Sequence, residues 1–416
     1  MTTNSMVEIG LRAKAAAMEV SQLSYDQRNT LLKKMAQSLL NNKDAIISAN
    51  KIDLAKYGDV LSQSMKKRLT LDDQVIDDMV TSLVAVAKLD DPLAGPFDSW
   101  RNHVDLKIVR KIVPIGVVAM VYEARPNVTV DAASLTLKSG NSVILRGGKE
   151  ALNSNKCLAN ILRRVLEENK FNPDFIQLIE DSSHEAVNEL LHMRETVDVL
   201  IPRGSANFID FVVTNATVPV IETGAGNTHI FVDDSANQEQ ALNIIHNAKT
   251  QKPSVCNAAE KLLIHTDIAK TFLPKIVDKL LAARVELRGD ELSRAIDSRI
   301  IPASLKDWDT EYNDLIMSIK IVQDLDEAIS WINQHTTHHS ETIISQTTDH
   351  VVQFMNLVDA AVVYQNASSR FTDGFEFGFG SEIGISTQKL HARGPMGLKA
   401  LTTIKYEVFG DGQIRK

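Results

Sequence analysis

The order of apolar segments after residue 100 constrains the fold more than any other feature of the sequence. Short apolar runs of strand length alternate there with longer runs of helical period. Strands are predicted at 104–109, 117–122, 142–145, 175–179, 197–201 and 218–221. The helices between them include 128–138 and a long amphipathic segment at 152–168. This β-α-β-α order predicts an α/β fold with a mostly parallel sheet that is covered by helices on both faces.

A second set of alternating segments begins near residue 229. Its strands are predicted at 229–232, 262–265, 317–322, 341–344 and 360–364, and its helices at 239–249 and 267–283. Because 416 residues are too many for one ordinary hydrophobic core, we interpret this set as a second α/β domain. Near the C-terminus, four glycines among aromatic residues at 373–384 indicate an ordered loop, and 401–408 alternates as a last strand.

The first hundred residues are predicted to be helical. Ser24 and Gln27 have the spacing of a capping box, and leucines and a methionine recur behind them at helical spacing. Two further helical patterns cover 43–56 and 71–88. A cluster of turn-forming residues then interrupts the helices: Asp91, Pro92, Gly95 and Pro96.

Composition and charge exclude several classes of protein. Hydrophobic content of 44% and charged content of 24% are those of a soluble globular protein. The net charge of −8 is spread without long runs of one sign, so neither nucleic acid nor a membrane is expected as a partner. The apolar stretch 112–122 is interrupted by Pro114 and is too short to span a bilayer, and residues 1–19 show no secretory signal. Two cysteines exclude a disulfide framework and favour the cytoplasm.

The common phosphate-binding and metal-binding signatures are missing from the sequence. No GxGxxG opens a helix after a strand, and no GxxxxGK[ST] occurs, which disfavours a kinase and an ordinary Rossmann dehydrogenase. These absences do not exclude an enzyme that binds a nicotinamide cofactor in another way. His335, His338 and His339 cluster, but no HExxH or paired-cysteine spacing accompanies them, so we predict no metal site.

Cys256 is the first candidate for chemistry. It follows Pro253 at a turn, among the polar residues Lys252, Ser254 and Asn257. A lone cysteine is more often a buried packing residue, but these neighbours favour partial exposure and a stabilised thiolate, which a nucleophile requires. Cys157 lies in an amphipathic helix and is interpreted as packing.

Two glycine-containing turns follow predicted strands. Residues 222–227 carry two glycines, which permit tight turning and close approach of the backbone to a ligand, although, taken alone, an ordinary turn explains them better. Residues 202–205 end in Ser205, which has the position to cap a following helix. A helix N-terminus beside Arg203 is suited to bind an anion.

Nine segments, taken in order, carry a resemblance that covers most of the chain. They are 113–127, 140–149, 201–205, 220–227, 254–260, 309–312, 335–341, 370–380 and 391–398. In these segments the chain resembles the aldehyde dehydrogenase superfamily. Within it, the chain is similar to the enzymes that reduce L-glutamate 5-phosphate to L-glutamate 5-semialdehyde with NADPH and release phosphate, in proline biosynthesis. It departs from their pattern at Trp331 and Thr336, where a histidine and a glycine are usual.

The resemblance implies a covalent mechanism. Cys256 would attack the acyl carbon, phosphate would leave, and hydride would reduce the resulting thioester. The oxyanion would be held by the backbone N–H of Cys256 and by a side chain at Arg125 or Asn127, and the sequence does not decide between the two. Glu222 takes the position of the base that activates water in hydrolytic relatives, and is expected here to serve positioning or proton transfer. Arg203 would contact the acyl phosphate.

The resemblance also implies a site for NADPH or NADP+. Arg146 and Lys149 would bind the adenosine ribose and its 2′-phosphate, and two cations favour NADPH over NADH. Gly204 and Ser205, at the start of a helix, would bind the pyrophosphate. Glu311 would bind the nicotinamide ribose.

Three domains and a homo-oligomer are implied as well. The expected ranges are 1–103 and 126–228 for a Rossmann-type nucleotide-binding domain with 366–388 packing near it, 229–365 for the catalytic domain, and 104–125 with 389–416 for a small β flap. The flap would pair 104–113 with 402–408 and join copies of the chain into a dimer or tetramer. Functional coupling to the upstream glutamate kinase is a further expectation.

Two rival interpretations stay open at this stage. The nearer one is an aldehyde-oxidising or CoA-acylating enzyme on the same scaffold. The other is a catalytically silent scaffold or binding protein, which Cys256 and Glu222 argue against.

Overall fold

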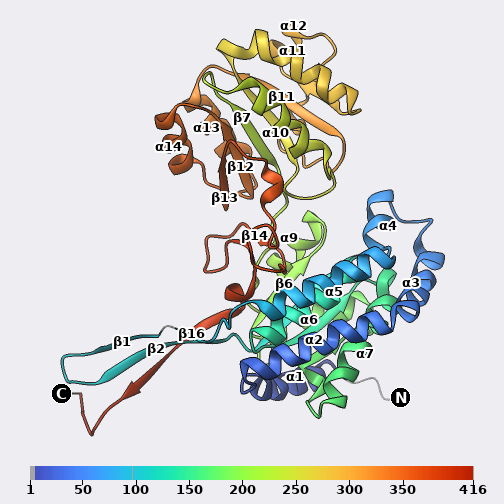
Figure 1. Cartoon of the computed structure of the whole chain (residues 1–416), viewed down its shortest axis with the longest axis vertical. Coiled ribbons are helices and arrows are strands. Elements are labelled where there is room, and N and C mark those ends of the chain that lie inside the picture. Colours follow the sequence, from blue (N-terminus) through green and yellow to red (C-terminus); the bar gives the residue numbers. More distant parts are fainter. Residues whose placement is uncertain (1–4, 96, 416) are drawn as a thin grey trace. The chain divides into compact units, whose positions relative to one another are not determined.

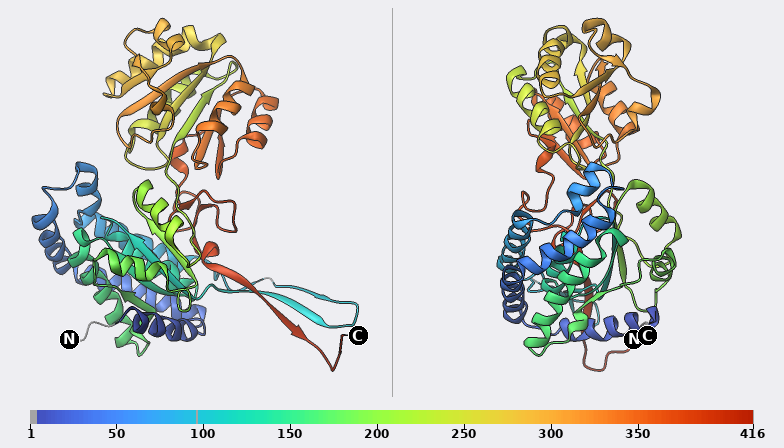
Figure 2. Two further views of the ribbon diagram at one scale, coloured as in Figure 1. Left: turned by 180° about the vertical axis from the view of Figure 1, so that it is seen from behind. Right: turned by 90° about the vertical axis from the view of Figure 1, so that its right-hand side faces the viewer.

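The computed structural model describes residues 5–95 and 97–415. Pro96, which belongs to the predicted break after the N-terminal helices, lies outside the described residues, as do residues 1–4 and 416 at the ends of the predicted domains. The chain forms two compact units (Figures 1 and 2). Unit 1 comprises Met1–Glu222, Gly378–Gly384 and Met396–Lys416, and unit 2 comprises Thr223–Phe377 and Ile385–Pro395. In the part of the chain that the structure describes, no helix is long and apolar enough to cross a membrane.

Unit 1 contains a parallel four-stranded sheet of order β5-β4-β3-β6. Its strands are β3 (Val117–Tyr122), β4 (Ser142–Gly147), β5 (Ile176–Leu178) and β6 (Val199–Arg203). All residues of β3 and β4 are buried, which explains why these strands read as continuous apolar runs without alternation. The strand predicted at 218–221 is reduced to a single parallel bridge between Val220 and Leu200.

Helices cover both faces of this sheet. The helices of unit 1 are α1 (Met6–Val20), α2 (Tyr25–Asn41), α3 (Lys43–Tyr57), α4 (Gln63–Leu69), α5 (Asp73–Lys88), α6 (Asn127–Lys138), α7 (Leu152–Glu168), α8 (His184–Leu191) and α9 (Ala206–Asn215). Apolar residues of α1, α8 and α9 pack on one face against alternate strand positions such as Ala119 and Leu200. The intervening positions face α6, where the Tyr122 hydroxyl lies 2.8 Å from that of Thr129. The predicted capping box of Ser24 and Gln27 is confirmed at the start of α2.

A three-stranded antiparallel sheet also belongs to unit 1. It has the order β1-β2-β16, with β1 (Asp98–Arg101), β2 (Lys107–Pro114) and β16 (Thr402–Phe409). The predicted pairing of the C-terminal strand is confirmed, since Thr402 lies opposite Pro114 and Phe409 opposite Lys107. The strand predicted at 104–109 is wrong at its start. Asp105 has a positive φ of 64° in the turn that joins β1 to β2, so the strand begins only at Lys107.

Unit 2 is built around a parallel seven-stranded sheet of order β10-β9-β11-β8-β7-β12-β13. Its strands are β7 (Thr228–Val232), β8 (Ala259–His265), β9 (Glu286–Gly289), β10 (Ile301–Pro302), β11 (Ile316–Val322), β12 (Ser340–Ile344) and β13 (Val362–Gln365). The helices are α10 (Gln238–Thr250), α11 (Thr266–Ala282), α12 (Glu291–Ile296), α13 (Leu325–His335) and α14 (Thr348–Leu357). A short ribbon of β14 (Ile385–Ser386) and β15 (Gly394–Pro395) completes the unit. The second predicted α/β core is therefore confirmed.

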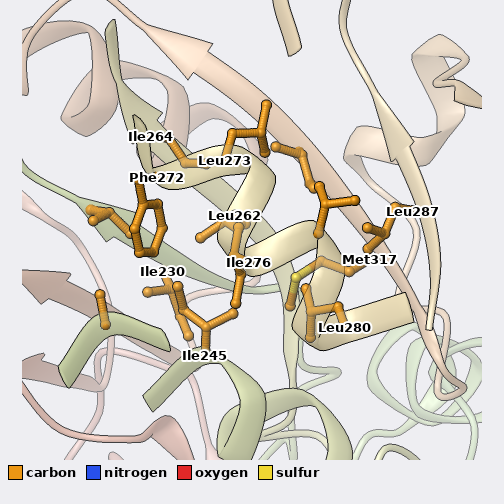
Figure 3. Close-up of a cluster of buried hydrophobic side chains, with 14 of the residues drawn as sticks. Ile230, Ile245, Leu262, Ile264, Phe272, Leu273, Ile276, Leu280, Leu287 and Met317 are labelled. Atoms are coloured by element: carbon orange, nitrogen blue, oxygen red, sulfur yellow. The ribbon is translucent and has the colours of Figure 1, made fainter. Parts of the chain in front are cut away.

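Alternate residues of β7, β8, β11 and β12 pack into two separate hydrophobic cores, one on each face of the sheet. Ile230 and Leu262 point to the face covered by α10 and α11, where they pack with Phe272 and Leu280 (Figure 3). Phe231, from the same strand as Ile230, points to the opposite face and packs with residues of α13 and α14. Burying a large aliphatic or aromatic side chain is worth about 1.5–3 kcal/mol, so these cores hold the sheet edges where polar loops attach.

The division into units differs from the predicted domain ranges at the C-terminal end. Residues 366–377 and 385–395 belong to unit 2, although the sequence placed 366–388 near the nucleotide-binding domain and 389–416 in the flap. The glycine-containing segment 373–384 thus contributes to both units. The reason for the difference is local, because Ser369 and Thr372 bond to polar side chains and carbonyls of unit 2.

Candidate active site

The predicted residues of unit 1 gather where three parallel strands end. β3 precedes both of its neighbours in the chain, with β4 on one side and β6 on the other. The loops after β3 and β6 therefore diverge at a topological switch point, where open α/β sheets commonly bind ligands. Glu123 begins the first loop, and its N–H donates to the carbonyl of Arg203, the last residue of β6, at 3.0 Å.

The loop after β3 carries Arg125 and Asn127, which are both partly buried. The side-chain amide of Asn127 donates to Oδ2 of Asp131 at 3.1 Å, one turn further along α6. Asp131 also accepts hydrogen bonds from Ser82 (3.4 Å) and Ser381 (3.3 Å). Burial raises the pKa of Asp131 to about 6, although these hydrogen bonds and the charge of Arg203 lower it. Asp131, which no sequence pattern indicated, thus fixes the amide of Asn127.

The loop after β6 carries Arg203, Gly204 and Ser205. Nε of Arg203 is buried and has no hydrogen-bond partner in the described ranges of the chain, so this cation retains a donor for an anion. Ser205 is the N-cap residue of α9, but the expected side-chain cap is not formed. Instead, the backbone N–H and the hydroxyl of Ser205 donate to the carboxylate of Glu123, at 2.7 and 3.3 Å. The carboxylate of Glu123 therefore occupies the helix start that the sequence analysis assigned to a pyrophosphate. The positive end of the helix dipole favours either anion.

Arg146 and Lys149 follow one another at the end of β4 but differ in environment. Arg146 is buried, and its guanidinium donates to the carbonyls of Ser182 and Ser183 at 2.7 and 2.8 Å. Burial lowers the pKa of Arg146, whereas Glu150 and Asp181 raise it. Lys149 is exposed at the start of a 3-10 turn, Lys149–Ala151. Arg146 therefore has a structural role that the sequence did not predict, and Lys149 is the accessible cation.

Glu222 is the last residue of unit 1 before the chain enters unit 2, and its side chain is partly buried. All predicted site residues other than Cys256 and Glu311 lie in unit 1.

Cys256, the nucleophile candidate, lies at the amino ends of the strands in the sheet of unit 2, whereas the candidates of unit 1 lie at the carboxyl ends. Cys256 precedes β8, in a turn at its amino end, and Glu311 likewise precedes β11. Cys256 is partly exposed, as predicted from its polar neighbours. Cys157 is also partly exposed but lies within α7, where burial raises the pKa of its thiol. A raised pKa disfavours the thiolate, so the packing interpretation of Cys157 suits its environment.

The loop before β7 packs directly against the backbone of the nucleophile. A Cβ on Gly226 would lie 1.5 Å from the carbonyl oxygen of Cys256, so no other residue fits there. The Gly226 N–H donates to Oε1 of Glu311 at 2.8 Å, which links the loops before β7, β8 and β11. The glycine predicted to approach a ligand thus approaches the nucleophile itself.

Two asparagines fix these loops with their side-chain amides. Asn227, fully buried, donates to the carbonyls of Trp308 and His335, both at 2.8 Å. Asn257, the neighbour of the nucleophile, donates to the carbonyl of Thr372 at 2.8 Å. Neutral amides that satisfy backbone carbonyls hold the loops in place without adding charge to the site.

A group of buried charges lies beneath the nucleophile loop and was missed by the sequence reasoning. Nζ of Lys249 lies 3.3 Å from Oε2 of Glu260, and both side chains are buried. Nζ of Lys261 donates to the carbonyl of Thr310 at 2.8 Å and lies 4.6 Å from the ring centre of Tyr312. Burial raises the pKa of Glu260 to about 7 and lowers that of Lys261 to about 8. These contacts hold the segment that carries Glu311. Glu260 and Lys261 stand at the start of the otherwise apolar strand β8, and this pattern could have indicated the buried charges from the sequence.

The three clustered histidines each have a different partner. Nδ1 of His335 lies 2.7 Å from Oδ1 of Asp309, that of His338 lies 2.6 Å from the carbonyl of Asp359, and that of His339 lies 2.8 Å from Ser340 Oγ. Across the described ranges, the acidic and histidine side chains close enough to share a metal ion are those of Asp233, Asp234 and His350. Asp233 there already accepts hydrogen bonds from Ser235 and Ser345, which indicates a structural network.

The two unusual residues near the histidines also have packing roles. Trp331 stacks edge-on against Trp308, with ring centres 5.4 Å apart, and lies under Nζ of Lys320 at 4.5 Å. The hydroxyl of Thr336 donates to the buried Glu341. Both substitutions are therefore accommodated within unit 2.

Known proteins are similar to this chain along most of its length. Residues 2–297 match the aldehyde dehydrogenase family. Gamma-glutamyl phosphate reductase of Leuconostoc citreum is 72% identical over 412 residues, which cover 99% of this chain and 99% of the relative. The enzyme of the same name from Leuconostoc mesenteroides is 69% identical over 413 residues, covering 99% and 100%.

A solved structure matches the whole fold. The crystal structure of gamma-glutamyl phosphate reductase from Thermotoga maritima has 46% sequence identity and a TM-score of 0.94, over 99% of both chains. This match confirms the predicted α/β architecture. The chain belongs to the aldehyde dehydrogenase family and, within it, to the group of the gamma-glutamyl phosphate reductases.

Proposed function

We propose that this chain reduces L-glutamate 5-phosphate to L-glutamate 5-semialdehyde and phosphate through a thioester on Cys256, with NADPH as reductant, in proline biosynthesis. The observation that carries the proposal is the environment of Cys256. It is a partly exposed thiol whose backbone is held by Gly226 and Asn257, in a chain 72% identical to an enzyme named gamma-glutamyl phosphate reductase.

In the proposed reaction, Cys256 is acylated first and is released as the thiolate at the end. The Cys256 thiolate forms a bond to the acyl carbon, and the bond from that carbon to the phosphate oxygen breaks, so phosphate leaves with its electron pair. NADPH, when bound, supplies hydride to the carbonyl carbon of the thioester. The resulting thiohemiacetal collapses, the thiolate leaves, and the aldehyde is released.

Residues of unit 1 would stabilise the charges that develop. Asn127 is the better candidate for the oxyanion, because Asp131 fixes its amide by accepting one N–H at 3.1 Å and leaves the second N–H as donor. Arg125 is the alternative. Arg203 would receive the departing phosphate, since its buried Nε has no partner in the described part of the chain and its guanidinium stays charged. Glu222 would serve positioning or proton transfer.

The residues present fit a nicotinamide cofactor at the switch point of unit 1. The buried Nε of Arg146 also has no hydrogen-bond partner among the described residues, so a donor there faces no acceptor of the protein. Lys149, exposed beside it, would bind the 2′-phosphate and favour NADPH. Ser205 and Gly204 would bind the pyrophosphate once Glu123 turns away, and Glu311 would bind the nicotinamide ribose.

The partners and location follow as further parts of the proposal. We infer a homo-oligomer, dimer or tetramer, formed through β16, an edge strand that exposes Ile404, Tyr406, Val408 and Phe409. The β2–β16 sheet would be extended or covered by a second copy of the chain. A cytoplasmic location suits an enzyme whose two cysteines form no disulfide. Coupling to the upstream glutamate kinase would protect a reactive acyl phosphate from water.

The test is phosphate-dependent reduction of NADP+ with glutamate semialdehyde, which is the reverse reaction. The wild type should reduce NADP+ only when phosphate is present. Cys256→Ser should lose this activity by at least about a thousandfold, because a neutral hydroxyl is a far weaker nucleophile than a thiolate. Cys157→Ser is the matched control and should stay active. Activity that requires no phosphate, or that requires coenzyme A, would refute the proposed reaction.

A further inference from the structure

Arg370 lies in a segment that the sequence singled out without giving this residue a role. We propose that the guanidinium of Arg370 stabilises the thiolate of Cys256 and so prepares the nucleophile for attack. Its importance for catalysis rests on the proposed function of Cys256, whereas the electrostatic contact between the two side chains does not.

Hydrogen bonds join the segment of Arg370 to the nucleophile loop. The hydroxyl of Ser369 donates to the carbonyl of Asn257 at 2.7 Å, and the Asn257 amide donates to the carbonyl of Thr372 at 2.8 Å. Nε of Arg370 donates to Oε1 of Gln251, at the start of the same loop, at 2.7 Å. These bonds hold the short helix Ser369–Phe371 against the turn that carries Cys256.

The charge of Arg370 interacts with that of the Cys256 thiolate. Cys256 is first among the groups whose charge interacts with Arg370, before Asp373 and Glu376. Burial lowers the pKa of Arg370 and these three anions raise it, but a guanidinium stays protonated across the working range of an enzyme. A permanent cation beside a thiol favours the thiolate and lowers the pKa of the thiol.

The other charged groups around Cys256 do not replace this cation. Asp373 and Glu376 are carboxylates and oppose formation of the thiolate. Glu311, which reaches Gly226 from the loop before β11, is also an anion. Lys252 is a second cation on the nucleophile's own loop. Removing Arg370 would therefore leave mainly negative charge near the thiol, and the pKa of Cys256 should rise.

A purely structural role does not account for the side chain. The contact from Asn257 reaches the backbone carbonyl of Arg370, at 3.4 Å, which any residue would offer. Nε of Arg370 donates to Gln251, and a neutral amide can also make this hydrogen bond. The positive charge is the property that the packing of this loop does not need.

The experiment measures the pH dependence of Cys256 alkylation by iodoacetamide, with no substrate or cofactor. A Cys157→Ser background leaves one thiol, because the chain has two cysteines. Arg370→Gln keeps a hydrogen-bond donor toward Gln251 and removes the charge, whereas Arg370→Lys keeps the charge. Arg393→Gln is the control, since this arginine of unit 2 pairs with Asp359 at 2.9 Å.

The midpoint of the alkylation profile should rise by about one pH unit or more in Arg370→Gln, which slows alkylation about tenfold at pH values below the midpoint. Arg370→Lys should stay near the wild-type midpoint, and Arg393→Gln should match it. An unchanged midpoint in Arg370→Gln, or equal rises for the Gln and Lys variants, would overturn the proposal. If circular dichroism finds Arg370→Gln unfolded, Arg370→Met is judged by the same criterion.

The alkylation midpoint tests the contact between Arg370 and Cys256, whereas the activity of Cys256→Ser tests the proposed function, so the two results are independent. A shifted midpoint together with full reductase activity in Cys256→Ser would retain the thiolate contact and refute the proposed nucleophile. An unchanged midpoint together with an inactive Cys256→Ser would refute the contact with Arg370 and retain Cys256 as the proposed nucleophile.

Discussion

In unit 1 the predicted binding residues follow parallel strands, whereas in unit 2 Cys256 and Glu311 precede them. The first arrangement is the usual one for open α/β sheets, whose ligands bind at the carboxyl ends of strands. At the carboxyl ends of β7 and β12 in unit 2, Asp233 is bonded to Ser345 and forms a closed polar network. The candidate residues thus lie at the carboxyl ends of the strands in unit 1 and at the amino ends in unit 2, and only the first position follows the general rule.

The two regions also differ in what holds their side chains. Around Cys256, the amide of Asn257, the hydroxyl of Ser369 and the carboxylate of Glu311 fix the backbone, and the charge of Arg370 interacts with that of Cys256. At the switch point of unit 1, charged groups are bonded to the protein itself, as Glu123 is to Ser205 and Arg146 to backbone carbonyls. The proposed nucleophile is therefore held by packing, whereas the binding residues proposed in unit 1 would have to exchange internal partners for ligands. Changes in packing should then act most strongly in unit 2.

Among changes to residues other than Cys256, the largest effect is expected from Gly226→Ala. The new methyl group would overlap the carbonyl of Cys256, whose oxygen lies 1.5 Å from the position of that Cβ. The backbone of the nucleophile must move, and a displacement of this size should lower kcat at least about a hundredfold. The measurement is kcat of the reductase reaction together with the thermal unfolding midpoint.

Gly412→Ala is the matched control, because a Cβ there meets no atom of the described chain within 4 Å. It should cost only the local strain of a positive φ, about 1 kcal/mol. A Gly226→Ala variant with a wild-type kcat would show that the packing of this loop does not position Cys256.

A graded effect is expected from Arg146, near the end of β4, and Lys149, just after it, which differ in burial. Lys149→Met should raise the KM for NADPH about tenfold and leave the KM for NADH nearly unchanged, because the exposed cation would read the 2′-phosphate. Arg146→Met should also reduce the free energy of unfolding by about 1–3 kcal/mol, since the carbonyls of Ser182 and Ser183 lose a donor. Steady-state kinetics with both cofactors and urea unfolding separate the two effects. Equal changes for NADPH and NADH in Lys149→Met would mean that the 2′-phosphate is recognised elsewhere.

The smallest effect concerns Asp131, whose pKa burial raises to about 6. Because the folded state holds its proton more tightly than the unfolded state, the contribution of Asp131 to stability is lost as pH rises from about 4 to 6. Asp131→Asn lacks this titration, so it should become more stable than the wild type by about 1–2 kcal/mol above pH 6, and by little at pH 4. Urea unfolding of both proteins across this range is the measurement. A difference that does not change with pH would exclude a raised pKa at Asp131.

The secondary structure was largely readable because strands at the centre of both parallel sheets, such as β3, β4, β7 and β8, are buried along their whole length. β3 was predicted with its observed ends, and α7 likewise. The errors have local causes. Asp105 adopts a left-handed conformation that a propensity argument does not foresee, and it delays the start of β2.

The candidate site was only partly readable. Cys256 and its partial exposure followed from polar neighbours in sequence. Arg370, Asp131 and Lys249 act through residues distant in the chain, so no local pattern announces them. Ser205 had the right residue type for a cap, but Glu123, which is distant in sequence, competes for its N–H and hydroxyl.

The central claim is the thioester on Cys256, and trapping it is the most direct test. Wild-type protein mixed with glutamate semialdehyde and NADP+ in the absence of phosphate should accumulate a glutamyl adduct, because no phosphate is present to resolve it. Peptide mass spectrometry should find this adduct on Cys256 and not on Cys157, and adding phosphate should remove it. No adduct under these conditions, with reductase activity intact, or an adduct confined to another residue, would contradict the covalent mechanism.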